Sequence, residues 1–72
     1  MQNIDTRDRL LTLIDILSRT SSSVKEIQEQ FTNIYGVAPD RKTLYHDLAA
    51  IEKHYPLHVL SRNKYGVPRY SL

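Results

Sequence analysis

Cysteine is absent from this 72-residue sequence, which excludes a disulfide scaffold and a cysteine-ligated zinc site and is typical of intracellular proteins. Glycine occurs only at Gly36 and Gly66, so no glycine-rich phosphate-binding loop can form. The apolar runs are far shorter than the ~20 residues that cross a bilayer, and residues 1–8 lack the apolar segment of a signal peptide. We therefore expect a cytoplasmic protein without a membrane partner.

Groups of residues that could carry out catalysis are also missing. Apart from carboxylates, the candidates for metal ligands are His46, His54 and His58. On a helix His46 and His54 would lie about 80° apart, and Pro56 separates His54 from His58, so we expect no shared metal ion. The sequence shows no nucleophile–base arrangement either. These observations predict a protein that is not an enzyme and that has no metal or other cofactor.

Positive charge is concentrated in the C-terminal half of the chain. Residues 1–40 carry four basic and six acidic side chains, a balance of −2, whereas residues 41–72 carry six basic and two acidic ones, a balance of +4. The overall formal charge of +2 hides this asymmetry. We expect residues 41–72 to form the electropositive surface.

Apolar periodicity predicts a first helix over about residues 6–19, with Asp5 as its N-cap. Its main apolar stripe consists of Leu10, Leu13, Ile14 and Leu17. Leu11 and Ile16 fall to either side of this stripe and are candidates for a dimer contact. The polar residues 20–23 then break the helical pattern.

Ser23 and Glu26 form the capping-box pattern, in which each side chain bonds the backbone amide of the other residue. The second helix is therefore expected to begin after Ser23 and to run to about Ile34. Gly36 suits the left-handed conformation that often ends a helix. The side chains expected to be buried are Val24, Ile27, Phe31 and Ile34.

Residues 40–55 are the most informative segment. A helix capped by Asp40 and ended by Pro56 places one apolar sector at Leu44, Leu48, Ile51 and Tyr55. The opposite sector holds Lys42, His46, Ala49 and Lys53, with Thr43 and Tyr45 on its flanks. This exposed sector has no acid and offers cations, hydroxyls and small side chains, which suits a groove in nucleic acid. Asp47 is expected to be a structural acid, with an arginine of the first helix as its partner.

The remaining residues change to a strand pattern. Residues 57–62 and 67–72 read as two strands around a turn at 63–66, and the second strand should be an edge or begin after Pro68. The order helix, helix, helix, hairpin predicts a mainly α fold with a small β-hairpin, the winged helix-turn-helix of three helices plus a two-stranded wing. We expect one such domain over residues 1–72.

In this fold the third helix, at about residues 40–55, enters the major groove of double-stranded DNA, and the wing at residues 57–72 meets the backbone or the minor groove. The predicted DNA-binding residues are Ser23, Arg41, Lys42, Thr43, Tyr45, His46, Lys53, Arg62, Asn63, Lys64 and Arg69. Those in the first turns of the third helix would meet base edges or flanking phosphates. Because one such domain covers a short half-site, useful specificity predicts a homodimer.

The chain also resembles a known family. Residues 9–17 (RLLTLIDIL), 25–27 (KEI), 40–48 (DRKTLYHDL), 51–52 (IE) and 55–56 (YP) look like the N-terminal winged helix-turn-helix of WYL-domain transcriptional regulators, near the DeoR-like group. The resemblance implies that Lys42, Thr43, Tyr45 and His46 contact DNA and that Asp47 has a structural role. It also implies transcription regulation in a bacterium or phage.

Three departures from the family pattern matter. His46 stands where the family usually has arginine, and the connection before the third helix is longer than the tightest helix-turn-helix turn. The sensory domain that usually follows is absent from this chain. The sequence is therefore either a DNA-binding domain whose effector domain is fused or separate, or a small free-standing protein.

The alternative is a winged helix that binds protein, such as a phage-type inhibitor, an antirepressor or an assembly adaptor. In that case Tyr45 would be a packing residue at the rim and His46 an ordinary solvated side chain. The basic third helix and the basic hairpin favour DNA, because a protein-binding surface more often shows exposed apolar anchors or acids there.

Overall fold

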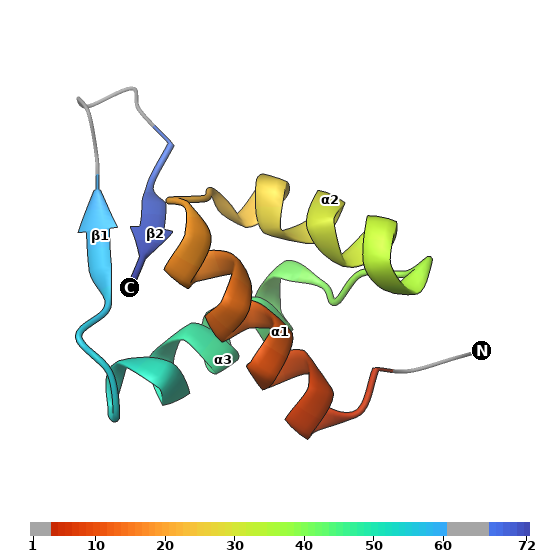
Figure 1. Ribbon diagram of the computed structural model, residues 1–72, viewed down its shortest axis with the longest axis horizontal. Coiled ribbons are helices and arrows are strands. Elements are labelled where there is room, and N and C mark those ends of the chain that lie inside the picture. The colour runs from red at the N-terminus through yellow and green to blue at the C-terminus, as the bar shows by residue number, and fades with distance from the viewer. Residues whose placement is uncertain (1–3, 61–66) are drawn as a thin grey trace.

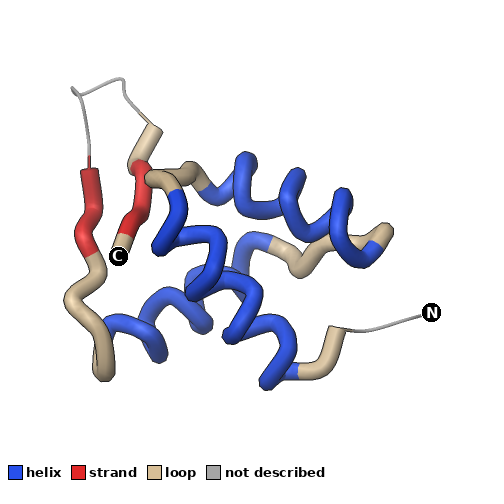
Figure 2. Tube along the Cα trace, viewed as in Figure 1, coloured by secondary structure: helices blue, strands red, loops and turns tan. Residues whose placement is uncertain are grey.

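The computed structural model describes residues 4–60 and 67–72, which form three helices followed by a two-stranded antiparallel hairpin (Figure 1). The elements are α1 (Thr6–Arg19), α2 (Val24–Tyr35), α3 (Arg41–Glu52), β1 (His58–Leu60) and β2 (Arg69–Ser71). The hairpin lies at one end of the molecule and the C-terminal end of α2 lies at the other (Figure 2). The predicted mainly α fold with a small hairpin is thereby confirmed.

All three helices begin directly after the predicted N-cap residues, and two of these residues cap their helix with a side-chain hydrogen bond. The Ser23 hydroxyl accepts a hydrogen bond from the Glu26 amide at 3.2 Å, and the Glu26 carboxylate accepts one from the Ser23 amide at 3.0 Å, which completes the capping box. Asp40 accepts from the amide of Thr43, in the first turn of α3, at 2.8 Å. Asp5 occupies the N-cap position of α1, but its side chain makes no capping hydrogen bond within the described residues.

The end of α3 differs from the prediction. The helix stops at Glu52, and the chain turns over residues 53–55, where the Lys53 and His54 amides bond carbonyls three residues back. Pro56 disfavours helical backbone only at Tyr55. Lys53 is therefore the C-cap and not part of the helix. Tyr55, predicted to be buried, is 48% exposed, since it no longer continues the apolar stripe of α3.

The core draws on all three helices. Its buried side chains are Leu13, Ile16, Leu17, Val24, Ile27, Phe31, Leu44, Leu48 and Ile51. Ile16 was predicted to lie outside the main stripe of α1, but it is buried, so it is unavailable as a dimer contact, whereas Leu11 is 59% exposed. Ile34 is 56% exposed although it was predicted to be buried, because it lies in the last turn of α2, beyond Phe31.

The hairpin pairs β1 with β2 in the register His58↔Ser71, Val59↔Tyr70 and Leu60↔Arg69. Within the described residues β1 begins at His58, one residue later than predicted, and β2 is shorter than predicted. β2 begins directly after Pro68, as expected for a residue without an amide donor. On its other edge β2 is joined to the α1–α2 connection, because Ser22 and Tyr70 exchange backbone hydrogen bonds of 2.9 and 2.8 Å. This bridge holds the hairpin beside the start of α2.

Candidate nucleic-acid interface

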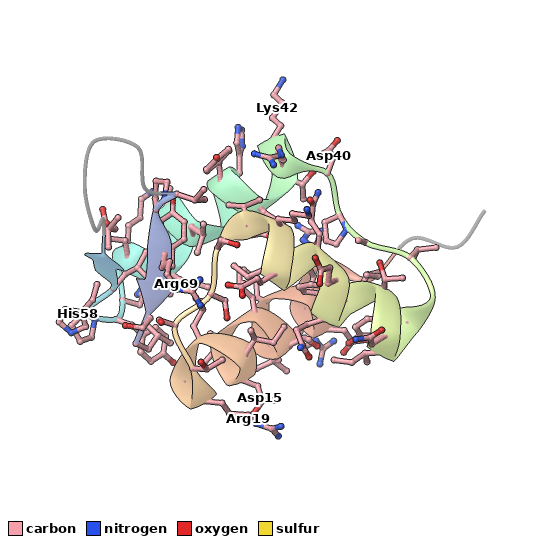
Figure 3. The ribbon with its side chains drawn as sticks, turned by 90° about the horizontal axis from the view of Figure 1, so that it is seen from above. Asp15, Arg19, Asp40, Lys42, His58 and Arg69 are labelled. Carbon is pink, nitrogen blue, oxygen red and sulfur yellow. The ribbon has the colours of Figure 1, made fainter. Side chains whose placement is uncertain are left out.

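The side of α3 that faces away from the core carries the predicted recognition residues. Lys42, Tyr45, His46 and Ala49 are exposed, while Leu44, Leu48 and Ile51 on the opposite side are buried. Lys42 projects from the molecule on the side opposite Arg19 of α1 (Figure 3). Thr43 is half-buried and its amide bonds Asp40. The predicted division of α3 into a core face and an exposed face is thus confirmed, except for Tyr55.

Asp47 of α3 is buried and does not lie on the exposed face of the helix. Its side chain turns inward and forms a two-pronged ion pair with Arg9 of α1, in which Arg9 Nε donates to Oδ2 and Nη2 donates to Oδ1 at 3.1 Å. This hydrogen bonding and the charge of Asp47 raise the pKa of Arg9 against the opposing effect of burial. The pair ties α3 to α1, as predicted, and it neutralises the only carboxylate in the middle of α3.

Asp40 is an acid at the N-terminal end of the exposed face of α3. Asp40 is exposed, and the hydrogen bonds from Thr43, first of all that from its amide, hold the pKa of this carboxyl below its usual value. Electrostatic interactions with Lys42 and His46 also lower the pKa of Asp40. Asp40 is therefore ionised at neutral pH, and a bound polyanion would meet it beside Lys42.

The polar side chains at the start of α2 are already bonded to other groups of the protein. Ser23 is buried, and its hydroxyl oxygen is already used as the cap of α2. The Glu26 carboxylate that completes this cap also forms an ion pair with Arg69 at 2.9 Å. The hydrogen bond from the Ser23 amide, and then the charge of Arg69, lower the pKa of Glu26 against the opposing effect of burial. Ser23 thus builds the helix end and does not present a free side chain.

Arg69 was predicted to be a DNA contact of the wing, but the structure uses its charge within the protein. Besides Glu26, its guanidinium contacts Ser21, with Nη2 donating to the Ser21 carbonyl at 2.8 Å and Nε to the Ser21 hydroxyl at 3.4 Å. These contacts fasten β2 to the α1–α2 connection and to α2. The three other predicted wing residues, Arg62, Asn63 and Lys64, lie outside the described residues, and Lys53 is exposed just after α3.

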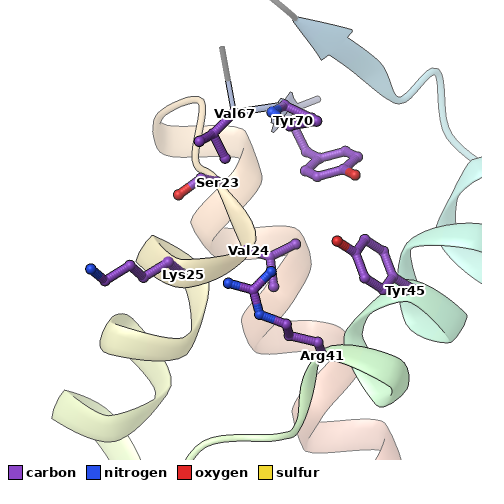
Figure 4. A pocket seen from close by; sticks show the side chains of 8 residues that line it. Ser23, Val24, Lys25, Arg41, Tyr45, Val67 and Tyr70 are labelled. Carbon is purple, nitrogen blue, oxygen red and sulfur yellow. The ribbon is translucent and has the colours of Figure 1, made fainter. Parts of the chain in front are cut away.

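A pocket of about 190 Å³ opens where α2, α3 and the segment leading into β2 meet (Figure 4). It brings together three of the predicted residues, Ser23, Arg41 and Tyr45, with Lys25 and Val24 of α2 and Tyr70 of β2. Lys25 was not among the predicted DNA-binding residues. The sequence did contain one signal for Lys25. A lysine in the first turn of a helix is unfavourable beside the positive end of the helix dipole, and a bound anion would compensate both charges.

None of the helices in the described part of the chain combines the length and the apolar character that a membrane span requires. Within residues 4–60 and 67–72, no three side chains of histidine, cysteine, aspartate or glutamate gather as a metal site.

Comparisons with known proteins add no relative. No protein-family model matches this chain, and no curated protein or solved structure matches it either.

Proposed function

We propose that this chain is a winged helix-turn-helix domain that binds double-stranded DNA sequence-specifically as a transcriptional regulator. The observation that carries the proposal is the exposed face of α3, which presents Lys42, Tyr45, His46 and Ala49 while Asp47 is turned inward onto Arg9. A helix of 12 residues is about 18 Å long and fits the major groove, which is about 12 Å wide. The small side chain of Ala49 leaves room for close approach to the base edges.

The position of the hairpin supports the same function. Its bridge to Ser22 and the contacts of Arg69 hold it beside α2, so its strands belong to the same end of the molecule as the pocket between α2 and α3. In a winged helix the wing contacts the backbone or the minor groove next to the recognition helix. The resemblance to WYL-domain regulators adds that a sensory domain, fused or separate, would control this DNA-binding domain.

The test begins with selection of bound duplexes from a random pool, which identifies a preferred sequence. Titration of that duplex and a scrambled control over a salt series should then give a steep loss of affinity with salt, because each neutralised phosphate releases counterions. On the scrambled duplex we expect a dissociation constant of about 1–100 µM at physiological salt, with tighter binding to the selected one.

A matched pair of variants separates recognition from general charge. Lys42→Ala and Arg19→Ala each remove one positive charge, but Arg19 lies on the opposite side of the molecule and pairs with Asp15 (Figure 3). Only Lys42→Ala should weaken binding. Equal effects of the two variants, or no binding to any duplex at low salt, would contradict the proposed function and favour a protein partner.

A further inference from the structure

The pocket between α2, α3 and β2 has two chemically different sides. Lys25 and Arg41 provide positive charge on one side, while the rings of Tyr45 and Tyr70 form the other. Figure 4 shows Arg41 extending from α3 toward α2 and the Tyr45 hydroxyl directed toward Tyr70. A ligand that fills this space therefore needs an anionic group next to a compact, less polar group.

The positive side has no carboxylate partner in the described part of the chain. Neither Lys25 nor Arg41 forms an ion pair there, whereas Arg9, Arg19 and Arg69 each do. The residues outside the described ranges contain no aspartate or glutamate. Figure 4 shows the Lys25 ammonium directed away from Arg41, but both residues line the same pocket, and an anion bound beside Arg41 would also attract the flexible Lys25 side chain.

The other side of the pocket is suited to a sugar ring. Pro68 and Val67, in the segment before β2, add apolar surface next to Tyr70. Burial, and then the neighbouring Tyr45, raise the pKa of Tyr70, so its hydroxyl keeps its proton at neutral pH and can donate a hydrogen bond. A volume of about 190 Å³ is that of roughly six waters in the liquid, which accommodates a phosphate with an adjoining sugar.

We propose that this pocket seats one sugar–phosphate unit of the DNA backbone, with the phosphate between Lys25 and Arg41 and the deoxyribose against Tyr45 and Tyr70. This inference rests on the proposed function and adds a specific contact to it. Because the seat is built from two helices and the hairpin, it would fix the position of α3 along the groove. The Arg69–Glu26 ion pair, which holds β2 against α2, then makes Arg69 a positioning residue for the seat.

The experiment replaces each phosphate of the selected duplex in turn by a neutral methylphosphonate. The wild-type protein should lose about tenfold in affinity at the seated phosphate, as expected for loss of a charge-assisted contact. The Lys25→Ala/Arg41→Ala double variant should bind the unmodified duplex more weakly and show no further loss at that position. Lys42→Ala, whose side chain does not line the pocket, should keep the full loss there.

Two further measurements test the folding of the variants and the identity of the ligand. Circular dichroism and thermal melting of each variant test folding, and Arg41→Gln replaces Arg41→Ala if the latter unfolds. Titration of the wild type with inorganic phosphate and with 2-deoxyribose 5-phosphate, followed by NMR, tests for a free small anion as the ligand. Tight micromolar binding of either, with displacement of DNA, would overturn the seat in favour of an effector site.

The two proposals fail in distinguishable ways. If the double variant loses as much as the wild type at every modified phosphate, the seat is wrong while DNA binding stands. If the wild type binds no duplex at low salt, both proposals are wrong.

Discussion

The ion pair between Arg9 and Asp47 should contribute more to folding than any other polar contact in the described residues. The Asp47 side chain is 8% exposed and that of Arg9 is 18% exposed, so removal of either partner leaves a largely buried charge without compensation. Breaking a buried pair in this way costs about 3–5 kcal/mol. A 72-residue domain has a free energy of unfolding of roughly 4–11 kcal/mol, so the loss would be a large part of its stability.

Replacement of Arg9 by Met strands the carboxylate, and we expect a loss of about 3 kcal/mol in the free energy of unfolding. Replacement of Asp47 by Leu should cost less, about 2 kcal/mol, because the partly exposed guanidinium can turn toward water. The double variant Arg9→Met/Asp47→Leu removes both charges and fills the space with apolar atoms. It should lie within about 1 kcal/mol of the wild type.

Urea unfolding of the four proteins, followed by circular dichroism at neutral pH, gives the coupling energy of the pair directly. The two single losses should together exceed the loss in the double variant by about 4–6 kcal/mol. If the losses add within about 0.5 kcal/mol, the two side chains contribute independently and the ion pair does not fix α3 to α1.

Three other outcomes follow from the structure. Leu48→Ala, which truncates a side chain that is 3% exposed, should lower the free energy of unfolding by about 2–5 kcal/mol, whereas Lys42→Ala should change it by less than about 0.5 kcal/mol. Thermal melts with the opposite order would show that the rotation of α3 about its axis is misassigned. Arg69→Ala should speed hydrogen exchange at the amides that bridge β2 to the α1–α2 connection. Glu26→Gln keeps the capping acceptor but removes the charge, so it should speed this exchange less. Unchanged exchange in both variants would mean that the ion pair does not hold the hairpin. Hydrogen bonds from backbone amides lower the pKa of the Glu26 and Asp40 carboxyls in the folded state. The stability that these carboxylates add is therefore present above their usual pKa values of 4.5 and 3.8, and it is lost as the pH falls through the lower pKa values of the folded protein. Glu26→Gln and Asp40→Asn should flatten this acid dependence in urea titrations, and an unaltered slope would contradict the assignment.

The starts of α2 and α3 and the end of α2 could be predicted because their signals are local. A serine with a glutamate three residues later defines the capping box, Asp40 reaches an amide three residues away, and Gly36 adopts a φ of +80° that other residues avoid. Each of these contacts is decided by chemistry within one turn of the chain. The short end of α3 was missed because the prediction placed the break at Pro56 itself, while the chain leaves the helix earlier.

The sidedness of α3 was also within reach of the sequence. Buried and exposed residues alternate with the helical period, and this placed Lys42 and His46 outside and Leu48 inside. The period does not, however, say how wide the buried sector of a helix is. Ile16 is buried on α1 because neighbouring elements cover that side of the helix, and only the packed structure determines this.

The sequence by itself determined the order of elements, two of the helix caps and the exposed face of α3, because these depend on spacing along one segment. The tertiary structure alone decided the fate of Arg69, whose partner Ser21 is 48 positions away, and the assembly of the pocket from Lys25, Arg41 and Tyr70. Such contacts depend on how the segments pack, and a basic residue in a hairpin looks the same in sequence whether it faces solvent or an acid on another helix.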